Sequence, residues 1–286
     1  MNNRQALAKS AATRALRIRA EVHAKPWDAI DVFDVAQQLG VEVRFTKISS
    51  MEGMYLRQEA PVILIASERP AGRQRFSCAH ELGHHAFGDG TRVDELFDPN
   101  SGTVRQDDEV RADMFAGMLL MPKSAVDHAF SVRKLHPATA NPLDFYRVAC
   151  WLGVGYSTLA GHLHYALRSI IQERFAALDR FTPKAIRESV LGQPTSEELV
   201  IVDEQWSGRP VDASVGDLLL LPPGTATEGP FCAKRAVLAH GVLYQAVTTG
   251  IGRFESPSGW AAFGRVTRKH YEGRSLFRHL EEVEDD

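Results

Sequence analysis

The residues of this chain best suited to chemistry lie in one short stretch, Cys78–Phe87, which reads "CAHELGHHAF". His80 and His84 are four positions apart, and Glu81 directly follows the first of them. On an α-helix, side chains at positions i and i+4 project from one face, so both imidazoles can direct a nitrogen at one cation roughly 2.0–2.1 Å away. Glu81 lies one step round the helix and can reach a water beside that cation. The spacing therefore predicts a helical metal site.

A catalytic zinc with two histidine ligands needs a third protein ligand and one position left for water. Glu109 and Asp113, in the segment "EVRAD", lie one helical turn apart further along the chain. We expect Glu109 to bind the metal and Asp113 to accept a hydrogen bond from the second nitrogen of a ligand histidine, which would fix its tautomer. Three other carboxylates compete for the third ligand position: Asp94, Asp107 and Asp108.

Two further residues of the opening stretch, His85 and Cys78, are expected to be structural. His85 projects away from the face shared by the other two histidines, and contact with substrate or with an oxyanion is the alternative role for it. Cys78 lies two positions before His80 and has the alternatives of metal ligand or redox switch. A small buried thiol is the commoner state of a free cysteine, so we expect Cys78 to be buried.

Composition excludes several classes of protein. The 286 residues include 33 Lys and Arg against 36 Asp and Glu, and a net charge of −3 disfavours charge-driven binding to nucleic acid or to an anionic membrane. The longest apolar runs, such as Val62–Ala66, are far shorter than the roughly 18 residues of a membrane-spanning helix. Three well-separated cysteines indicate no disulfide framework and no cysteine zinc site, which favours a reducing, cytoplasmic setting.

Elements that would position the site can be read from hydrophobic periodicity. A helix is expected over residues 30–39, ending at Gly40, and the segment 73–87 has a helical pattern that would carry the histidines. Strands are expected at 41–46 and, more deeply buried, at 61–66. Residues 53–56 are expected to form a third, exposed strand whose edge binds the substrate backbone.

The character of the sequence changes near residues 192–196. Before this point, helical segments fill the chain from Lys123 to about Arg180, and after it short β-type runs are separated by Gly- and Pro-rich turns. The aromatic residues of this last part are expected to form its core rather than a ligand site; they are Trp206, Tyr244, Phe254 and Trp260.

Residues 148–167 have the spacing of a helix-turn-helix unit, which raises the alternative of a DNA-binding regulator. The recognition helix would present Tyr156 and Ser157, but it has no Lys or Arg before Arg168. Anchoring to phosphates normally needs more cationic side chains, so we expect this segment to serve packing.

Two segments together resemble a known family. The stretch "RQRFSCAHELGHHAFGD" followed by "EVRADMFAGMLLMP" is similar to the ImmA/IrrE family of bacterial metallopeptidases, whose pattern is H-E-x-x-H and then E-x-x-[AS]-[DN]-x-F-A-x-x-L-L-M-P. Both motifs occur here in the order of the family. The resemblance covers roughly residues 20–135 and extends with less detail to about residue 180.

The resemblance implies roles for individual residues. His80 and His84 match the metal-binding histidines, Glu81 the general base and Glu109 the glutamate ligand, while Asp113 matches the position that orients a ligand. It also implies a zinc-dependent endopeptidase that cleaves helix-turn-helix repressors and relieves repression in stress responses or mobile-element control. Manganese or iron are alternatives to zinc because a His₂Glu site accepts them too.

Taken together, these observations predict an α+β protein in three parts. A compact thermolysin-like metallopeptidase core is expected over residues 1–135, a helical segment resembling a helix-turn-helix over 136–192, and an appended β-rich domain over 193–286. The alternative function is a DNA-binding or protein-binding transcriptional regulator in which the metal site is structural. The expected partner is a protein substrate, a helix-turn-helix repressor; direct nucleic-acid binding is disfavoured and no membrane is involved.

Overall fold

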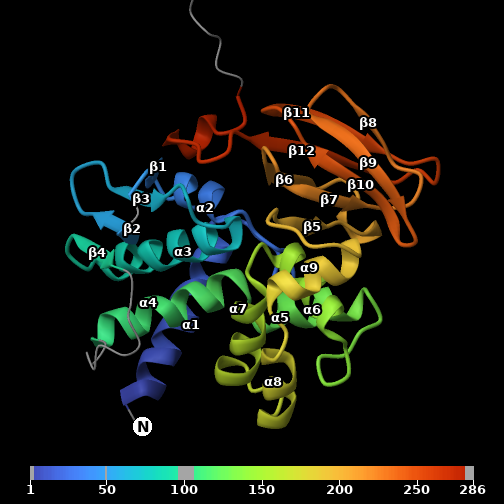
Figure 1. The fold of residues 1–286 in the computed structure, drawn as a ribbon. Coiled ribbons are helices and arrows are strands. Elements are labelled where there is room, and N and C mark those ends of the chain that lie inside the picture. The colour runs from blue at the N-terminus through green and yellow to red at the C-terminus, as the bar shows by residue number, and fades with distance from the viewer. Residues whose placement is uncertain (1–2, 49, 96–105, 281–286) are drawn as a thin grey trace, which may run out of the picture.

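A computed structural model describes residues 3–48, 50–95 and 106–280. The chain has a mixed α+β architecture: a sheet and four helices from the N-terminal part, a group of short helices beside them, and two small sheets from the C-terminal part (Figure 1). Among the described residues, no helix is both long enough and apolar enough to cross a bilayer.

The N-terminal sheet has the strand order β13-β1-β3-β2-β4. Its strands are β1 (Glu42–Thr46), β2 (Met51–Leu56), β3 (Val62–Ala66), β4 (Arg92–Glu95) and β13 (Gly273–Arg274). β1 and β3 run parallel, and the other pairs are antiparallel. The expected strands at 41–46 and 61–66 are confirmed as β1 and β3. β13, from the C-terminal part of the chain, therefore pairs with β1 and belongs to the N-terminal sheet.

The expectation for residues 53–56 is wrong in two respects. β2 is an interior strand, since it pairs with β3 on one side and with β4 on the other, and neither backbone edge is left for a peptide. It is also buried along most of its length, because helix α3 (Ala71–Phe87) packs against it. Nothing in the sequence of residues 53–56 indicated that β4 would pair with this strand.

The helices of the N-terminal part follow the sequence signals for helix ends. They are α1 (Asn3–Glu21), α2 (Val32–Gln38), α3 and α4 (Asp107–Leu120). The Asp31 carboxylate caps α2 by accepting a hydrogen bond from the Phe33 amide at 3.0 Å, and Gly40 follows the helix with a φ of 75°. α4 packs against both α1 and α3, so the two helices with the candidate ligands are direct neighbours (Figure 1).

Short helices make up the segment that resembles a helix-turn-helix. They are α5 (Lys123–Ser131), α6 (Pro142–Leu152), α7 (Tyr156–Gly161), the π-helical turn η1 (His162–Ala166), α8 (Gln172–Asp179) and α9 (Pro183–Leu191). Tyr156, which the DNA-binding alternative placed on the recognition surface, is only 2% exposed. Its hydroxyl donates a hydrogen bond to the Leu178 carbonyl at 2.8 Å. This geometry favours the packing role for α7.

The C-terminal part forms two four-stranded sheets, ordered β5-β7-β10-β9 and β6-β12-β11-β8. Their strands are β5 (Leu199–Ile201), β6 (Pro210–Ser214), β7 (Leu218–Leu221), β8 (Ala226–Glu228), β9 (Cys232–Leu238), β10 (Gly241–Ala246), β11 (Gly250–Glu255) and β12 (Ala261–Thr267), with the short turns η2 (Glu204–Trp206) and η3 (Ser275–Phe277). The four aromatic residues expected in this core are buried there, which confirms that expectation.

Candidate metal site

Helix α3 carries three of the candidate residues on its buried second half. The helix begins after Pro70 and ends at Gly88, which adopts a left-handed conformation with a φ of 71°. His80 and His84 are 2% and 0% exposed, and Glu81 is 0% exposed. Burial of three ionisable groups on one helix is costly unless they have charged or hydrogen-bonded partners. These three side chains therefore need charged or hydrogen-bonded partners inside the protein.

Helix α4 supplies the fourth residue because it approaches α3 closely. At the crossing point α3 has Gly83, where an added Cβ would lie 3.1 Å from the Phe115 ring and 3.2 Å from the Ala112 Cα. A side chain at this position would push the helices apart. With glycine there, the Glu109 carboxylate at the start of α4 reaches both histidines of α3.

Three ligand atoms converge at the contact between the two helices. The Nε2 atoms of His80 and His84 are 3.1 Å apart, and the Glu109 carboxylate lies 3.2 Å from the first and 3.4 Å from the second. Ligands placed at zinc distances around a tetrahedral centre are about 3.3–3.4 Å from one another. The three side chains thus form a group that could hold a metal ion, and its spacing fits a tetrahedral zinc site.

The other nitrogen of each histidine faces a carboxylate. His80 Nδ1 lies 2.9 Å from Asp113 Oδ1, and His84 Nδ1 lies 2.9 Å from Asp89 Oδ2. A carboxylate can only accept, so each Nδ1 carries the hydrogen and each Nε2 is left with its lone pair. Two such lone pairs 3.1 Å apart repel one another unless a proton or a cation lies between them. This arrangement is the one that metal-binding histidines use.

Sequence reasoning missed Asp89. The left-handed Gly88 turns the chain back after α3, so that the Asp89 amide donates to the His84 carbonyl at 3.0 Å and its carboxylate meets the ring of the same residue. Arg111 of α4 donates to the other Asp89 oxygen at 2.8 Å and fixes it. The available signal was a helix-ending glycine followed directly by an acidic residue.

Replacing Asp89 by asparagine is expected to weaken zinc binding by about 10–100-fold, because an amide cannot hold the His84 tautomer as a carboxylate does. A competition titration against a fluorescent zinc chelator measures this. Asp127→Asn is the matched control, since Asp127 is half exposed and pairs with Lys123 on the surface. Equal affinity in the Asp89 variant and the wild type would remove the orienting role.

The electrostatics of the site also favour a cation. Burial alone would lower the pKa of His80, but its hydrogen bonds with Asp113 and Glu109 outweigh burial and raise that pKa to about 10. The pKa of His84 is raised in the same way, by Glu109 and Asp89 against burial. The hydrogen bonds from both histidines hold the pKa of Glu109 well below its usual range. Without a metal ion, protons take up the position between these groups.

Glu81 lies beside the site against strand β2. Gly53 faces it there, and an added Cβ at Gly53 would lie 2.8 Å from Glu81 Oε1 and 3.0 Å from its Cγ. A Cβ so close to the side chain of a fully buried residue forces that side chain to move. The place of the Glu81 carboxylate is therefore set by the absence of a side chain at residue 53.

Gly53→Ala is consequently expected to reduce peptide hydrolysis by about 100-fold while leaving zinc affinity unchanged, because a displacement near 1 Å disrupts proton transfer without touching the ligands. Steady-state kinetics and a zinc titration on the same protein separate the two effects. Gly90→Ala is the control, since a Cβ there meets no atom within 4 Å. Full activity in the Gly53 variant would show that Glu81 needs no such fixed position.

Among the described side chains, the competing carboxylates Asp107 and Asp108 do not join the ligand group. Asp107 accepts a hydrogen bond from Asn3, and Asp108 accepts one from the Glu109 amide, so both serve the start of α4. Asp94 lies in β4, and its side chain is outside the described part of the chain. His85 contacts the Tyr55 hydroxyl through its Nδ1 at 3.0 Å, which agrees with a structural role. Cys78 is fully buried, as expected.

Comparison with models of known protein families gives a match. The sequence profile of the family Peptidase_M78, described as "IrrE N-terminal-like domain", matches residues 36–160. This range includes α3 and α4, and so all four candidate residues as well as both aspartates that contact the histidines. No curated protein matched the chain.

Proposed function

Residues 36–160 belong to the IrrE N-terminal-like family of metallopeptidases, and on that premise we propose that this protein is a zinc-dependent endopeptidase. The observation that carries the proposal is the convergence of His80, His84 and Glu109, whose ligand atoms all lie within 4.8 Å of one another. We further propose that helices α3 and α4 with the N-terminal sheet form a thermolysin-like core.

The proposed reaction divides the work among a few side chains. A divalent ion at this site acidifies a water molecule and polarises the scissile carbonyl. His80, His84 and Glu109 hold that ion, and Asp113 and Asp89 keep the two imidazoles in the tautomer that leaves Nε2 free. Glu81 takes the proton of the attacking water and later delivers it to the leaving amine. One carboxylate thus serves first as base and then as acid.

Zinc binding should release protons near neutral pH. In the metal-free protein the pKa of His80 is about 10, so this residue is protonated at pH 7, whereas a metal ligand must be neutral. We expect at least one proton to be released per zinc bound, and the apparent affinity to rise about tenfold per pH unit between pH 6 and 8. Calorimetric titrations in buffers of different ionisation enthalpy count the protons, and a count of zero would contradict the prediction.

The identity of the metal is proposed from the ligand types. Two imidazoles and one carboxylate in a tetrahedral arrangement suit zinc, while manganese and iron are accepted by similar sites. Metal analysis of protein purified without added zinc distinguishes the three ions. A cytoplasmic location is part of the proposal, because the three cysteines are free thiols.

The proposed substrate is a helix-turn-helix repressor whose cleavage relieves repression, in a stress or mobile-element response. This assignment is supported by the resemblance to ImmA/IrrE peptidases. It is tested by incubating the protein with a repressor encoded beside its own gene and following cleavage with and without a chelator. We expect chelator-sensitive cleavage at a defined bond. A repressor that stays intact under every condition would overturn the substrate assignment.

A further inference from the structure

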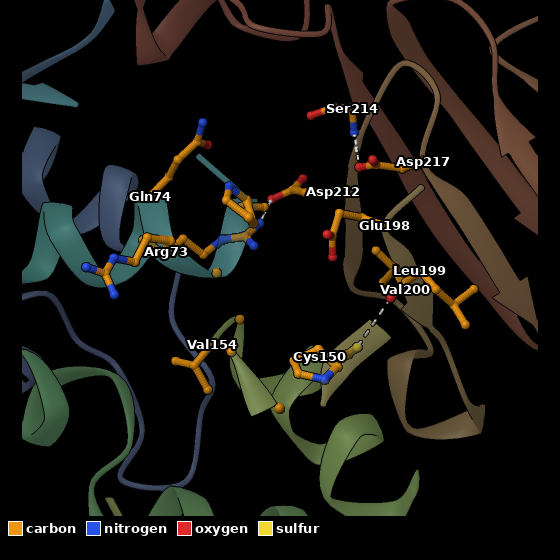
Figure 2. A pocket seen from close by; sticks show the side chains of 18 of the residues that line it. Arg73, Gln74, Cys150, Val154, Glu198, Leu199, Val200, Asp212, Ser214 and Asp217 are labelled. Atoms are coloured by element: carbon orange, nitrogen blue, oxygen red, sulfur yellow. Dashed lines mark hydrogen bonds and ion pairs between the residues drawn. The ribbon is translucent and has the colours of Figure 1, made fainter. Parts of the chain in front are cut away.

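A cavity of about 590 Å³ lies between the start of α3 and the C-terminal sheets. In Figure 2, Arg73 and Gln74 of α3 lie on one side of it and Glu198 and Asp217 on the other, with Asp212 between them and Cys150 and Val154 below. None of the candidate metal ligands lines it. The volume falls in the usual range for small-molecule sites, so this cavity is a second place where the protein can bind a ligand.

A smaller cavity of about 50 Å³ adjoins the first. The two share lining residues at the start of α3, among them Ser67, Ala71, Gln74 and Arg75. The lining of the smaller one also includes residues that follow β12, among them His279. We call the two cavities the large and the small compartment; Ser67 and Ala71 line both.

The start of α3 is suited to an anion. The helix is 17 residues long, no side chain caps its first turn through a hydrogen bond, and that turn contains no acidic residue. Amide groups at such a helix start carry a partial positive charge and bind phosphate or carboxylate groups readily. Ala71, the first residue of the helix, lines both compartments.

Two buried side chains at the same place lack hydrogen-bond partners. Ser67 is 4% exposed and His279 is 8% exposed, yet within the described structure neither the Ser67 hydroxyl nor His279 Nε2 has a partner. Asp212 Oδ1 lies 3.8 Å from His279 Nε2, close enough for an ion pair with a charged imidazole but beyond hydrogen-bond reach. Buried polar atoms are nearly always bonded, and both residues line the small compartment, so a ligand bound there would offer them the partner they lack.

Charge in the small compartment has the sign that an anion needs. Its lining includes three arginines against one carboxylate; the arginines are Arg75, Arg268 and Arg278. The carboxylate, Asp212, already accepts hydrogen bonds from Arg75 and from Arg265 on β12. Arg278 in turn donates to Asp31 at 2.8 Å, so arginines outnumber carboxylates in this lining although two of the three already have carboxylate partners.

The opposite wall of the large compartment has different chemistry. Glu198 and Asp217 face the cavity there (Figure 2), and Arg187, which also lines it, donates to the Glu198 carboxylate at 2.9 Å. Carboxylate oxygens accept hydrogen bonds, so this wall favours a ligand body with donors such as hydroxyl or amino groups. Trp206 and Leu199 contribute apolar surface to the same compartment.

We propose that the two compartments bind a small polar molecule that carries one phosphate group, with the phosphate in the small compartment at the start of α3 and its hydroxyl- or amino-bearing body in the large one. This site is separate from the proposed peptidase centre and does not depend on it. The same helix carries His80 nine residues further along, so an occupant contacts both the C-terminal sheets and the helix of the metal site.

Calorimetry and thermal unfolding of the full-length protein test this proposal with defined probes. Inorganic phosphate is expected to bind and to raise the unfolding temperature. Adenosine 5′-monophosphate, which adds hydroxyl and amino donors, is expected to bind at least about tenfold more tightly than phosphate or than adenosine. An absence of phosphate binding overturns the proposal. Citrate that binds as tightly as the nucleotide would overturn phosphate as the recognised group.

Single substitutions test whether phosphate binds in the small compartment. Ser67→Ala and His279→Gln should each weaken phosphate binding about tenfold, because each removes one hydrogen bond to a charged group. Ser207→Ala is the matched control, since Ser207 is exposed and lines neither compartment, so phosphate affinity should not change. Unaltered phosphate affinity in both the Ser67 and the His279 variants would overturn the proposal. Zinc content should be equal in all four proteins.

Discussion

Glu81→Gln is expected to lower the rate of peptide hydrolysis by about 10²–10⁴-fold, the range that a general base contributes. Glutamine has nearly the same shape as glutamate, so it should fit the fully buried space against Gly53. The glutamine amide cannot take up the proton of the attacking water, so the fall in rate reports the loss of the general base. Single-turnover cleavage of a saturating substrate reports the chemical step directly.

The metal content of the Glu81→Gln protein should equal that of the wild type, because Glu81 is not one of the converging ligands. Glu59→Gln is the control for a change of charge, since Glu59 is exposed on the connection between β2 and β3. A Glu81 variant that keeps full activity with metal bound would contradict the assignment of the general base. If it lost activity but kept its full biological effect, hydrolysis would not be the function.

Glu109→Ala is expected to weaken zinc binding by more than about 100-fold, which exceeds the effect of losing a residue that only orients a ligand. The carboxylate supplies the one negatively charged ligand of the group, and without it two neutral imidazoles would have to hold the ion alone. Activity at limiting zinc should fall in parallel. Equilibrium dialysis against buffered zinc gives the affinity.

Glu173→Ala provides a control for the Glu109 variant, because Glu173 is an exposed glutamate in the first turn of α8. Zinc affinity of the control should match the wild type. Should the Glu109 variant bind zinc as tightly as the control, one of the remaining carboxylates near the start of α4 would have to be the third ligand.

The sequence was sufficient for the parts of the site that follow helical geometry. The spacing of His80 and His84 fixes their shared face, and the one-turn separation of Glu109 and Asp113 places both carboxylates toward α3. The helices α2 and α3 and the strands β1 and β3 could be predicted because each has a clear hydrophobic period and a recognisable end.

What the sequence could not provide depends on contacts between distant segments. Asp89 reaches His84 only through the left-handed turn at Gly88, and β2 is covered only because β4 pairs with it. The small compartment at the start of α3 is lined by residues that lie far apart in the chain, from Phe33 to His279. Pairings over such distances leave no periodic signal in a single sequence.

The central claim, that one metal ion is held between α3 and α4, is tested most directly by metal analysis of two proteins. Wild-type protein and the His80→Ala/His84→Ala double variant are stripped with a chelator, incubated with excess zinc and desalted. The proposed site predicts about one zinc per chain in the wild type and none in the double variant. Equal zinc content in both, or none in the wild type, would contradict it.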